Sequence, residues 1–391
     1  GNMNIVHFSD THLGYREFHR MDPQTGINQR EQDVYNAFRE VIDRTLELEP
    51  DLVIHAGDLF DSVRPTNRAV NVATDQLSRL SEAGITTVVI AGNHDTPKIS
   101  TTGTITRSLD RLAHVEAVTS DPTGDNQGYR KIPAGDALIH AVSDTPTEQE
   151  LAKRIKDLEP EDRYSWNVLV LHAGIRVLEG AIFSGEFNEH HVDRDLLEHT
   201  GFDYIALGHY HKRMEVELSS NTMAVYSGAP ERFSFNEASY RPGFIAVNLS
   251  ESGISYDEQL IDTRGFADLG IVEGEGLSVE ELIAAIESRL EDREIDNRLV
   301  SLKLTSVDDN TYSLLEEKYL DDIRDRCFET NFQVTGPEDF SSEDSSLAFS
   351  DLRVEFSDFI ENRADVPEGI DAEEIIEIGQ KYLGVALGEE D

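Results

Sequence analysis

Five short apolar segments of this chain each run directly into residues of the kinds that bind metal ions. The segments are IVHFS before Asp10 and His12, LVIHA before Asp58, VVIA before Asn93 and His94, VLVL before His172, and YIAL before His209 and His211. Short apolar runs bounded by glycine and polar residues are typical of buried strands. Because the carboxyl ends of strands meet at one edge of an open α/β sheet, the residues that follow them share a crevice. One Asp or Asn after a strand is weak evidence, since turns favour these residues, but five successive cases indicate a site.

The types of donor restrict the chemistry of this site. Seven potential ligands are expected to gather there: Asp10, His12, Asp58, Asn93, His172, His209 and His211. Carboxylate and imidazole without thiolate favour Mn²⁺, Fe²⁺ or Zn²⁺ over the oxygen cages of Ca²⁺ or Mg²⁺. Seven side chains are too many for one tetrahedral ion and suit two ions about 3.5 to 4 Å apart, an arrangement used for in-line attack at phosphorus. Asp58 is the natural bridging candidate.

His94 is expected to act without binding a metal. Adjacent residues at a strand end rarely bind the same ion, so His94, which follows Asn93, is a candidate general acid. Asp95 could orient His94, and a plain turn or cap role for Asp95 is equally open. Five other histidines lie outside the pattern and are expected to be structural: His7, His55, His114, His140 and His199.

Helical patterns alternate with the strands as far as His211. The apolar stripe of residues 29–48 predicts one helix and residues 66–83 a second, with shorter candidates at 104–112, 148–158 and 193–199. Residues 214–261 instead read as antiparallel strands separated by turn residues, which could form a second sheet behind the first. The fold class predicted is therefore α/β, with layers of helices, two sheets and helices.

A length of 391 residues suggests two or three domains. We predict a catalytic domain over residues 1–262, a small α+β domain over 263–340, and an acidic linker with a helical element over 341–391. The α+β domain has helix candidates at 278–291 and 312–327 around a strand at 299–304. The last helix has an apolar face formed by Ile375, Ile376, Gly379, Tyr382 and Leu383. This face either docks on its own domain or, as we prefer, lies in a groove of another chain.

The chain is strongly acidic. It has 34 Lys plus Arg against 77 Asp plus Glu, a formal charge of −43, yet 38% of its residues are hydrophobic and the acids are spread throughout. That combination argues against a disordered acidic protein. Self-repulsion would destabilise the fold in dilute salt, whereas at molar salt the Debye length falls to about 3 Å. We therefore predict a halophilic source, and a phosphate-bearing substrate held by metal ions or a local basic rim rather than by net charge.

Other classes of protein are disfavoured by what the sequence lacks. The single cysteine, Cys327, rules out a disulfide framework and a cysteine zinc site. No run of 18 apolar residues occurs, and the first residues do not resemble a signal peptide. We expect a soluble protein with no membrane contact in a reducing, high-salt prokaryotic cytoplasm.

The motifs resemble those of a known family. Asp10-x-His12, Gly57-Asp58-x-x-Asp61, Gly92-Asn93-His94-Asp95, His172 and Gly208-His209-x-His211 resemble the calcineurin-like metallophosphoesterases. The longer strings SDTHLGY, GDLFD, AGNHD and GHYHK are similar to those of the Mre11/SbcD DNA-repair nucleases within that superfamily. The resemblance covers residues 3 to 262 and is far weaker beyond them.

This resemblance implies a mechanism and partners. It implies two Mn²⁺ per subunit, one held by Asp10, His12, Asp58 and His211, the other by Asp58, Asn93, His172 and His209, with His94 as the catalytic non-ligand. It further implies a homodimeric nuclease with 3′ to 5′ exonuclease and single-strand endonuclease activity, which processes double-strand break ends beside the ATPase Rad50. By position, residues 263–340 would contact DNA and residues 341–391 would bind Rad50.

Several basic residues are candidates for DNA contact. The loop between Tyr15 and Gln29 is longer than in compact relatives and contains Arg16, His19 and Arg20, while Arg64 and Arg232 lie elsewhere. Arg suits phosphate oxygens, although an exposed Arg is often only a solvated surface group. Many relatives carry histidine where this chain has Asp61, so Asp61 either assists the substrate or braces its loop.

The sequence is also compatible with two alternative functions. A protein or small-molecule phosphoesterase could use the same scaffold, but protein phosphatases usually show Asp-Arg-Gly after the second motif and Gly-Asn-His-Glu at the third. Here the corresponding residues are Asp61-Ser62-Val63 and Asp95. The chain could also be a DNA-end tether or Rad50 scaffold whose metal centre is dispensable, which sequence does not distinguish from a nuclease.

Overall fold

The fold is described from a computed structural model over residues 1–97, 103–120, 128–176, 190–337 and Ile376. The chain forms two compact units. The first comprises Gly1–Asp268 and the returning segment Ile295–Val300, and the second comprises Leu269–Glu294 and the described residues from Ser301 onward. The boundary therefore follows Asp268, where the sequence suggested a limit near residue 263. The linker from residue 341 and the apolar face of the last helix lie outside the described residues, apart from Ile376.

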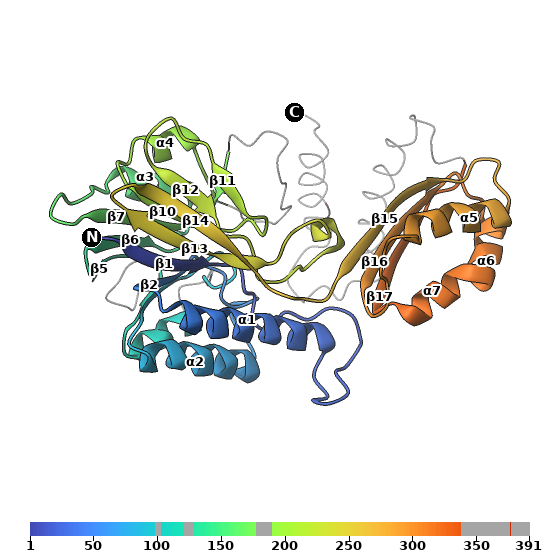
Figure 1. Ribbon diagram of the computed structural model, residues 1–391, viewed down its shortest axis with the longest axis horizontal. Helices are drawn as coiled ribbons and strands as arrows, with labels where there is room; N and C mark the ends of the chain where they lie inside the picture. Colours follow the sequence, from blue (N-terminus) through green and yellow to red (C-terminus); the bar gives the residue numbers. More distant parts are fainter. Residues whose placement is uncertain (98–102, 121–127, 177–189, 338–375, 377–391) are drawn as a thin grey trace. The chain divides into compact units, whose positions relative to one another are not determined.

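The first unit contains a six-stranded sheet in the order β14-β13-β1-β2-β3-β4 (Figure 1). Strands β1 to β4 are parallel, whereas β13 is antiparallel to both β1 and β14. The bounds are β1 Met3–Phe8, β2 Leu52–His55, β3 Thr86–Ile90, β4 Val115–Val118, β13 Gly243–Ser250 and β14 Gly253–Leu260.

A second six-stranded sheet has the order β11-β12-β10-β7-β6-β5. Its central strands β6, β7, β10 and β12 are parallel, and the two outer strands are antiparallel to their neighbours. The bounds are β5 Tyr129–Ala134, β6 Ala137–Val142, β7 Trp166–His172, β10 Tyr204–Gly208, β11 Met214–Val216 and β12 Met223–Tyr226. A short parallel ladder joins β8 (Gly174–Ile175) to β9 (His191–Val192).

The division of strands between the sheets corrects two expectations. The strands of residues 214–261 do not build a second sheet by themselves, because β11 and β12 join β10 while β13 and β14 join β1. The five strands that precede the candidate ligands also do not share one sheet edge, since β1, β2 and β3 lie in one sheet and β7 and β10 in the other. The sequence of a short apolar strand does not indicate which other strand it will pair with. Pairing is decided by which free edge and which buried face the rest of the fold offers.

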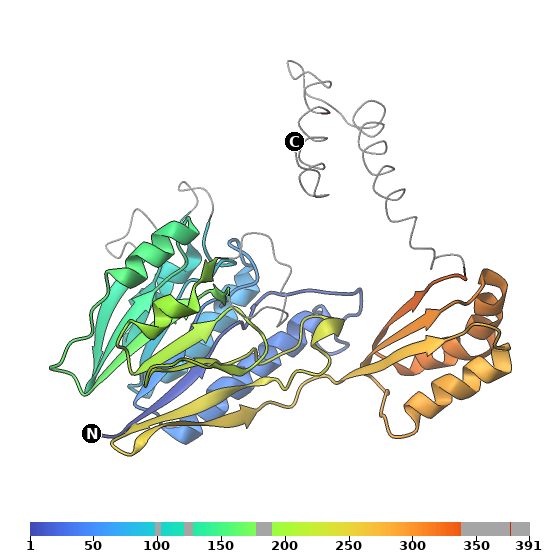
Figure 2. The ribbon, with the colours of Figure 1, turned by 90° about the horizontal axis from the view of Figure 1, so that it is seen from above.

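The layered architecture predicted from the sequence is confirmed. Between the sheets lies a core that includes Ile5, Ile54, Val88, Ile139, Val168 and Val170. Helices α1 (Gln29–Leu48) and α2 (Asn67–Glu82) cover the outer face of the first sheet, where Phe38 and Leu77 pack with Val53. Helices α3 (Glu148–Lys156) and α4 (Arg194–Glu198) cover the second sheet on its other side, and Leu151 packs with Leu169 (Figure 2).

Side-chain caps explain where helices α1 and α2 begin. The Asn28 side chain accepts hydrogen bonds from the backbone N–H groups of Arg30 and Glu31, so α1 begins at Gln29. Thr66 caps α2 in the same way through the N–H of Ala69. Residues 104–112, predicted to be helical, contain the 3₁₀ helix η1 (Ile105–Arg111), and a second short 3₁₀ turn is η2 (Phe235–Glu237).

The second unit is a three-stranded sheet with helices. Its strand order is β15-β16-β17, with bounds β15 Phe266–Glu273, β16 Leu299–Thr305 and β17 Glu329–Val334. Helix α5 (Val279–Leu290) begins with a capping box between Ser278 and Glu281. The helix predicted at 312–327 instead starts after the Asp308 cap and is divided into α6 (Asp309–Leu315), the π-helical turn η3 (Glu316–Leu320) and α7 (Asp321–Arg326). No helix in the described ranges is long and apolar enough to cross a membrane.

Candidate metal centre

The site is assembled from strand ends of both sheets of the first unit. Asp10 and His12 follow β1, Asp58 follows β2 and Asn93 follows β3. From the other sheet come His172, the last residue of β7, and His209 and His211 after β10. The prediction of a shared crevice assumed one sheet. The structure brings the same side chains together because the carboxyl ends of two parallel-stranded layers meet.

Two loops that carry carboxylates run alongside each other. The N–H of Asp10 donates to the carbonyl of Gly57 at 3.0 Å, and the N–H of His12 donates to the carbonyl of Asp58 at 3.1 Å. Asp10, His12 and Asp58 all have positive φ, at 55°, 43° and 56°. Side-chain-bearing residues rarely adopt this conformation, and it persists where the surrounding structure enforces it, often at functional sites.

Glycines in the motifs let these loops approach one another. A Cβ atom at Gly57, which has φ of 97°, would lie 2.4 Å from Nδ1 of His172. A Cβ atom at Gly92 would lie 2.2 Å from Oδ1 of Asp58. Both distances are below any real contact, so the Gly-Asp and Gly-Asn-His motifs need glycine for close packing around Asp58 and His172.

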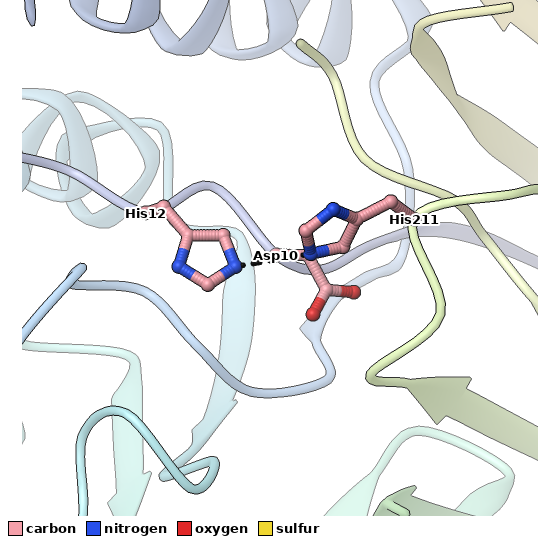
Figure 3. A group of neighbouring side chains, drawn as sticks. All are labelled: Asp10, His12 and His211. Atoms are coloured by element: carbon pink, nitrogen blue, oxygen red, sulfur yellow. Dashed lines mark hydrogen bonds between the residues drawn. The ribbon is translucent and has the colours of Figure 1, made fainter. Parts of the chain in front are cut away.

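One group of potential ligands is formed by Asp10, His12 and His211 (Figure 3). Each offers an atom within 4.8 Å of the atoms offered by the others. Nε2 of His12 lies 3.2 Å from Nε2 of His211, as the dashed line in Figure 3 marks. Since the two imidazole nitrogens and the Asp10 carboxylate converge on one point, a divalent cation fits among them.

A second group is formed by Asp10, Asp58 and His172, again within 4.8 Å of one another. Nε2 of His172 lies 3.1 Å from Oδ2 of Asp58 and 3.0 Å from Oδ1 of Asn93. The same Asp58 oxygen is 3.9 Å from Nε2 of His12. Asp58 therefore belongs to the second group and lies near His12 of the first, whereas Asp10 belongs to both groups.

His209 joins this cluster through its backbone and its ring. Its N–H donates to both carboxylate oxygens of Asp10, at 3.2 and 3.1 Å. Its ring lies edge-on to His172, with centroids 5.4 Å apart. The side chain is buried, with 5% of the residue exposed.

Groups outside the cluster orient two of the imidazoles through hydrogen bonds at Nδ1, and a carboxylate lies near Nδ1 of a third. Nδ1 of His172 lies 2.8 Å from the carbonyl of Ala56, which can only accept, so this nitrogen carries the hydrogen and Nε2 faces Asp58. Nδ1 of His211 lies 2.8 Å from Oε1 of Glu237, whereas Nδ1 of His12 lies 3.4 Å from Oδ1 of Asp61 without a hydrogen bond to it. Such outward hydrogen bonds are common for metal-binding histidines.

Glu237 was missed by sequence reasoning. It lies 26 residues after His211 in the short turn η2, in a segment that reads as a plain loop. No spacing rule connects the two positions, so only the folded chain reveals the contact.

The protonation states of Asp58 and His172 depend on each other. Burial raises the pKa of Asp58, but the neighbouring imidazoles, His172 first, hold it well below the usual range of a carboxyl group. Burial lowers the pKa of His172, but the Asp58 carboxylate overcomes this and raises it to about 10. Without a metal, a proton on His172 therefore balances Asp58, and a bound cation would take over that role.

His94 lies at the edge of this cluster. Its Nδ1 is 3.0 Å from the carbonyl of Asp61, and its backbone N–H donates to Oδ1 of Asp58 at 2.9 Å. The ring is edge-on to His12, with centroids 4.8 Å apart. Because a carbonyl only accepts, Nδ1 is the protonated nitrogen and Nε2 is the atom that can exchange a proton with a substrate. The Asp61 carboxylate forms a third close group with His12 and His94.

Asp95 braces the loop that carries Asp58. Its buried carboxylate accepts hydrogen bonds from the backbone N–H groups of Leu59 at 3.0 Å, Phe60 at 2.9 Å and Gly92 at 3.2 Å. Burial and the charge of Asp58 raise the pKa of Asp95 to about 7. Of the two roles considered for Asp95, these contacts favour the turn role over orientation of His94.

The predicted DNA-contact residues fall into two kinds. Four have exposed side chains: Arg16, His19, Arg20 and Arg64. Arg232 is half-buried, donates from Nε to the carbonyl of Tyr240 at 2.9 Å, and lies over the Phe266 ring at 5.7 Å. Its guanidinium is thus engaged within the first unit, as expected of a structural arginine.

Two histidines outside the motifs are buried next to the site. Nδ1 of His7 lies 2.7 Å from the hydroxyl of Tyr204, and Nε2 of His55 lies 2.9 Å from Oγ1 of Thr11. Burial lowers the pKa of both imidazoles to about 3. They are neutral packing residues at neutral pH.

Comparison with known proteins agrees with this geometry. The family model described as calcineurin-like phosphoesterase matches residues 3–213. The DNA double-strand break repair protein Mre11 of Methanocaldococcus jannaschii is 30% identical over 288 residues, which cover 69% of each chain. The chain belongs to the Mre11 family of calcineurin-like phosphoesterases.

Other Mre11 proteins align over less of their length. The protein from Sulfurisphaera tokodaii is 34% identical over 229 residues, or 58% of this chain and 54% of that one. The protein from Methanosarcina acetivorans is 30% identical over 81% of this chain and 48% of that one. The chain thus spans about half of these two relatives.

Several solved phosphoesterase structures resemble this Mre11-family chain at low similarity. A dimetal phosphatase from Danio rerio has a TM-score of 0.41 and 11% identity, and the match covers 66% of this chain and 96% of that one. A similarity this low supports no conclusion about function.

Proposed function

We propose that this chain is a Mn²⁺-dependent DNA nuclease that processes the ends of double-strand breaks. The observation that carries the proposal is the convergence of Asp10, Asp58 and the imidazoles of His12, His172 and His211 within a few ångströms. Buried carboxylates and imidazoles in two touching groups suit a pair of divalent cations. Membership of the Mre11 family supports DNA as the substrate, since relatives are described as double-strand break repair proteins.

Each metal would be held by four side chains. Asp10, His12, Asp58 and His211 would bind one Mn²⁺, and Asp58, Asn93, His172 and His209 the other. Two bound cations would make a water nucleophilic near neutral pH and offset charge on the phosphodiester. The short distances from Oδ2 of Asp58 to His172 and His12, 3.1 and 3.9 Å, support its bridging role.

His94 would protonate the departing oxygen. The carbonyl of Asp61 holds Nδ1–H at 3.0 Å, which fixes the tautomer and directs Nε2 as the exchanging atom. Asp58 further anchors the His94 backbone at 2.9 Å, so the acid would be positioned by the same carboxylate that would hold the metals. His94 needs no direct contact with either cation in this role.

The activities and partners follow the family. We infer 3′ to 5′ exonuclease and single-strand endonuclease activity, a homodimer, and action beside the Rad50 ATPase. DNA contacts would come from Arg16, His19, Arg20 and Arg64, whose side chains are exposed. Because the guanidinium of Arg232 already contacts Tyr240 and Phe266, Arg232 would have only a supporting role in DNA binding.

Two substitutions test the mechanism. Asp58→Ala should abolish both Mn²⁺ binding and cleavage of linear duplex DNA, whereas His94→Ala should bind Mn²⁺ as the wild type does and lose cleavage. Calorimetry would count the ions, and anomalous scattering at the manganese edge would locate them. Nuclease activity that survives in Asp58→Ala would refute the two-metal centre, and a wild type that turns over a phosphotyrosine substrate but not DNA would refute the nuclease.

A further inference from the structure

Two exposed arginines beside the metal centre share one buried carboxylate. Glu31, in the first turn of α1, is buried, with 1% of its side chain exposed. Nε of Arg16 lies 2.8 Å from its Oε2, and Nη1 of Arg68 lies 3.2 Å from its Oε1. The hydroxyl of Tyr35 donates to Oε1 at 2.7 Å. One carboxylate therefore fixes two guanidiniums from separate segments, Arg16 from the loop after β1 and Arg68 from the first turn of α2.

Both arginines keep donors directed to solvent. Their side chains are 52% and 47% exposed, and each uses a single nitrogen on Glu31. Among the residues that the structure describes, neither guanidinium has another hydrogen-bond or ion-pair partner. An arginine has five N–H donors, so most of both guanidinium forks remain available to an anion. With one carboxylate between two cations, the cluster has one net positive charge.

The pair lies near the candidate catalytic centre. Arg16 follows His12 by four residues, a span of at most about 14 Å, or about four nucleotides of one strand at 3.4 Å rise. The ring centroids of Tyr15 and Phe233 are 5.0 Å apart, and those of Phe233 and His12 are 4.9 Å apart. The first turn of α2 also abuts this loop, because a Cβ atom at Gly14 would lie 3.3 Å from Ala69.

We propose that Arg16, Glu31 and Arg68 form a clamp for the phosphate backbone of the nucleic-acid strand that enters the metal centre. The inference rests on the proposed nuclease function and assigns Arg68, which no sequence motif identifies. A chain with a formal charge of −43 repels a polyanion. Cationic side chains close to the metals are therefore expected to contribute strongly to DNA binding. Arginine forks match phosphate oxygens in pairs.

Pre-organisation is the contribution of Glu31. An exposed arginine loses side-chain freedom when it binds, whereas these two are already held by a buried anion. Because phosphate contacts position a strand without reading bases, the clamp is expected to be independent of sequence.

The test compares the DNA affinity of a variant without the clamp with that of the wild type. The variant Arg16→Gln/Arg68→Gln also carries Glu31→Gln, so that no buried carboxylate is left unpaired. Binding of an oligonucleotide duplex is followed by fluorescence anisotropy, with His94→Ala present to prevent cleavage. We expect weaker binding, and a slope of log affinity against log salt that is smaller by about 1.8, or about 0.9 for each lost phosphate contact. Hydrolysis of a nitrophenyl phosphodiester by the wild type shows separately whether the metal centre is active.

Arg163→Gln is the matched control. Arg163 is 72% exposed, pairs with Glu161 at 2.8 Å, and precedes the amino end of β7, away from the strand ends that carry the ligands. If the clamp variant keeps the affinity and the salt slope of this control, the clamp is refuted while the nuclease stands. A wild type that hydrolyses neither DNA nor the small diester would instead refute the proposed function, and the clamp with it.

A second variant provides the test if the Gln variant does not fold. Arg16→Lys/Arg68→Lys keeps both charges next to Glu31 but removes the forks. It should retain the salt slope and bind the duplex several-fold more weakly. Wild-type affinity in this variant would also overturn the clamp.

Discussion

Glu237 holds His211 by its outer nitrogen, with Oε1 2.8 Å from Nδ1, while its Oε2 accepts the backbone N–H of Phe233 at 2.7 Å. Phe233 in turn lies edge-on to His211 and His12, at 5.1 and 4.9 Å between ring centroids. The Glu237 carboxylate thus orients the candidate ligand His211 and also holds Phe233, which packs against the candidate ligand His12.

Glu237→Gln should weaken Mn²⁺ binding without unfolding the protein. The amide keeps one acceptor but loses the charge that favours a strongly basic imidazole, and loss of such outer partners typically costs about 10- to 100-fold in metal affinity. Titration calorimetry measures the change. Glu198→Gln, which alters a surface contact to Ser219, is the control, and equal Mn²⁺ affinity in the two variants would contradict the role of Glu237.

Mn²⁺ binding should release protons and strengthen as pH rises. His172 has its pKa raised to about 10 in the metal-free protein, and only its neutral form can bind a metal. Each pH unit below that value should therefore cost about tenfold in affinity for each proton displaced. Calorimetry in buffers of different ionisation enthalpy counts the protons, and affinity independent of pH between 6 and 9 would argue against His172 as a ligand.

Asp95→Asn should destabilise the fold. The amide offers one acceptor where the carboxylate oxygens accept three backbone hydrogen bonds, from Leu59, Phe60 and Gly92. Leaving a buried N–H unsatisfied costs about 1 to 3 kcal/mol. Denaturant unfolding measures the loss, and because these N–H groups flank Asp58, a fall in Mn²⁺ affinity should accompany it. Unchanged stability would mean that water replaces the lost acceptor.

Acid should destabilise the protein partly through His7. Its folded pKa, lowered by burial to about 3, lies below the ordinary value of 6.5. Between these values the unfolded chain binds more protons, so this contribution is complete above pH 6.5 and is lost as pH falls, by about 1.4 kcal/mol per unit. The free energy of unfolding of His7→Asn should fall less steeply between pH 6.5 and 4. Parallel curves would show that His7 titrates normally in the folded protein.

Salt should stabilise the protein strongly. With a formal charge of −43, the folded chain repels itself until counter-ions screen it. The midpoint of thermal unfolding should rise steadily from about 0.1 M to above 1 M KCl, over which the Debye length falls from about 10 to 3 Å. A midpoint that is highest in dilute buffer would contradict the prediction of a halophilic source.

Sequence alone determined the local elements and the identity of the cluster. The 20 residues of α1 coincide with the predicted range, because an apolar stripe of helical period and the Asn28 cap are both written locally. The sequence predicts that Asp10, Asp58 and His172 lie together, and their side chains do converge, although they come from the strand ends of two sheets rather than one. Both signals depend on neighbours within a few residues or on a general rule of topology.

Tertiary structure decided how the strands were shared and which residues support the ligands. The sequence of β13 does not reveal that it pairs with β1 rather than with β12, because edge pairing depends on which strand is left open. The contacts of Glu237 with His211 and of Glu31 with Arg68 join residues 26 and 37 positions apart. A hydrogen bond between distant segments leaves no periodic pattern in a single sequence, so only the folded chain brings such pairs into view.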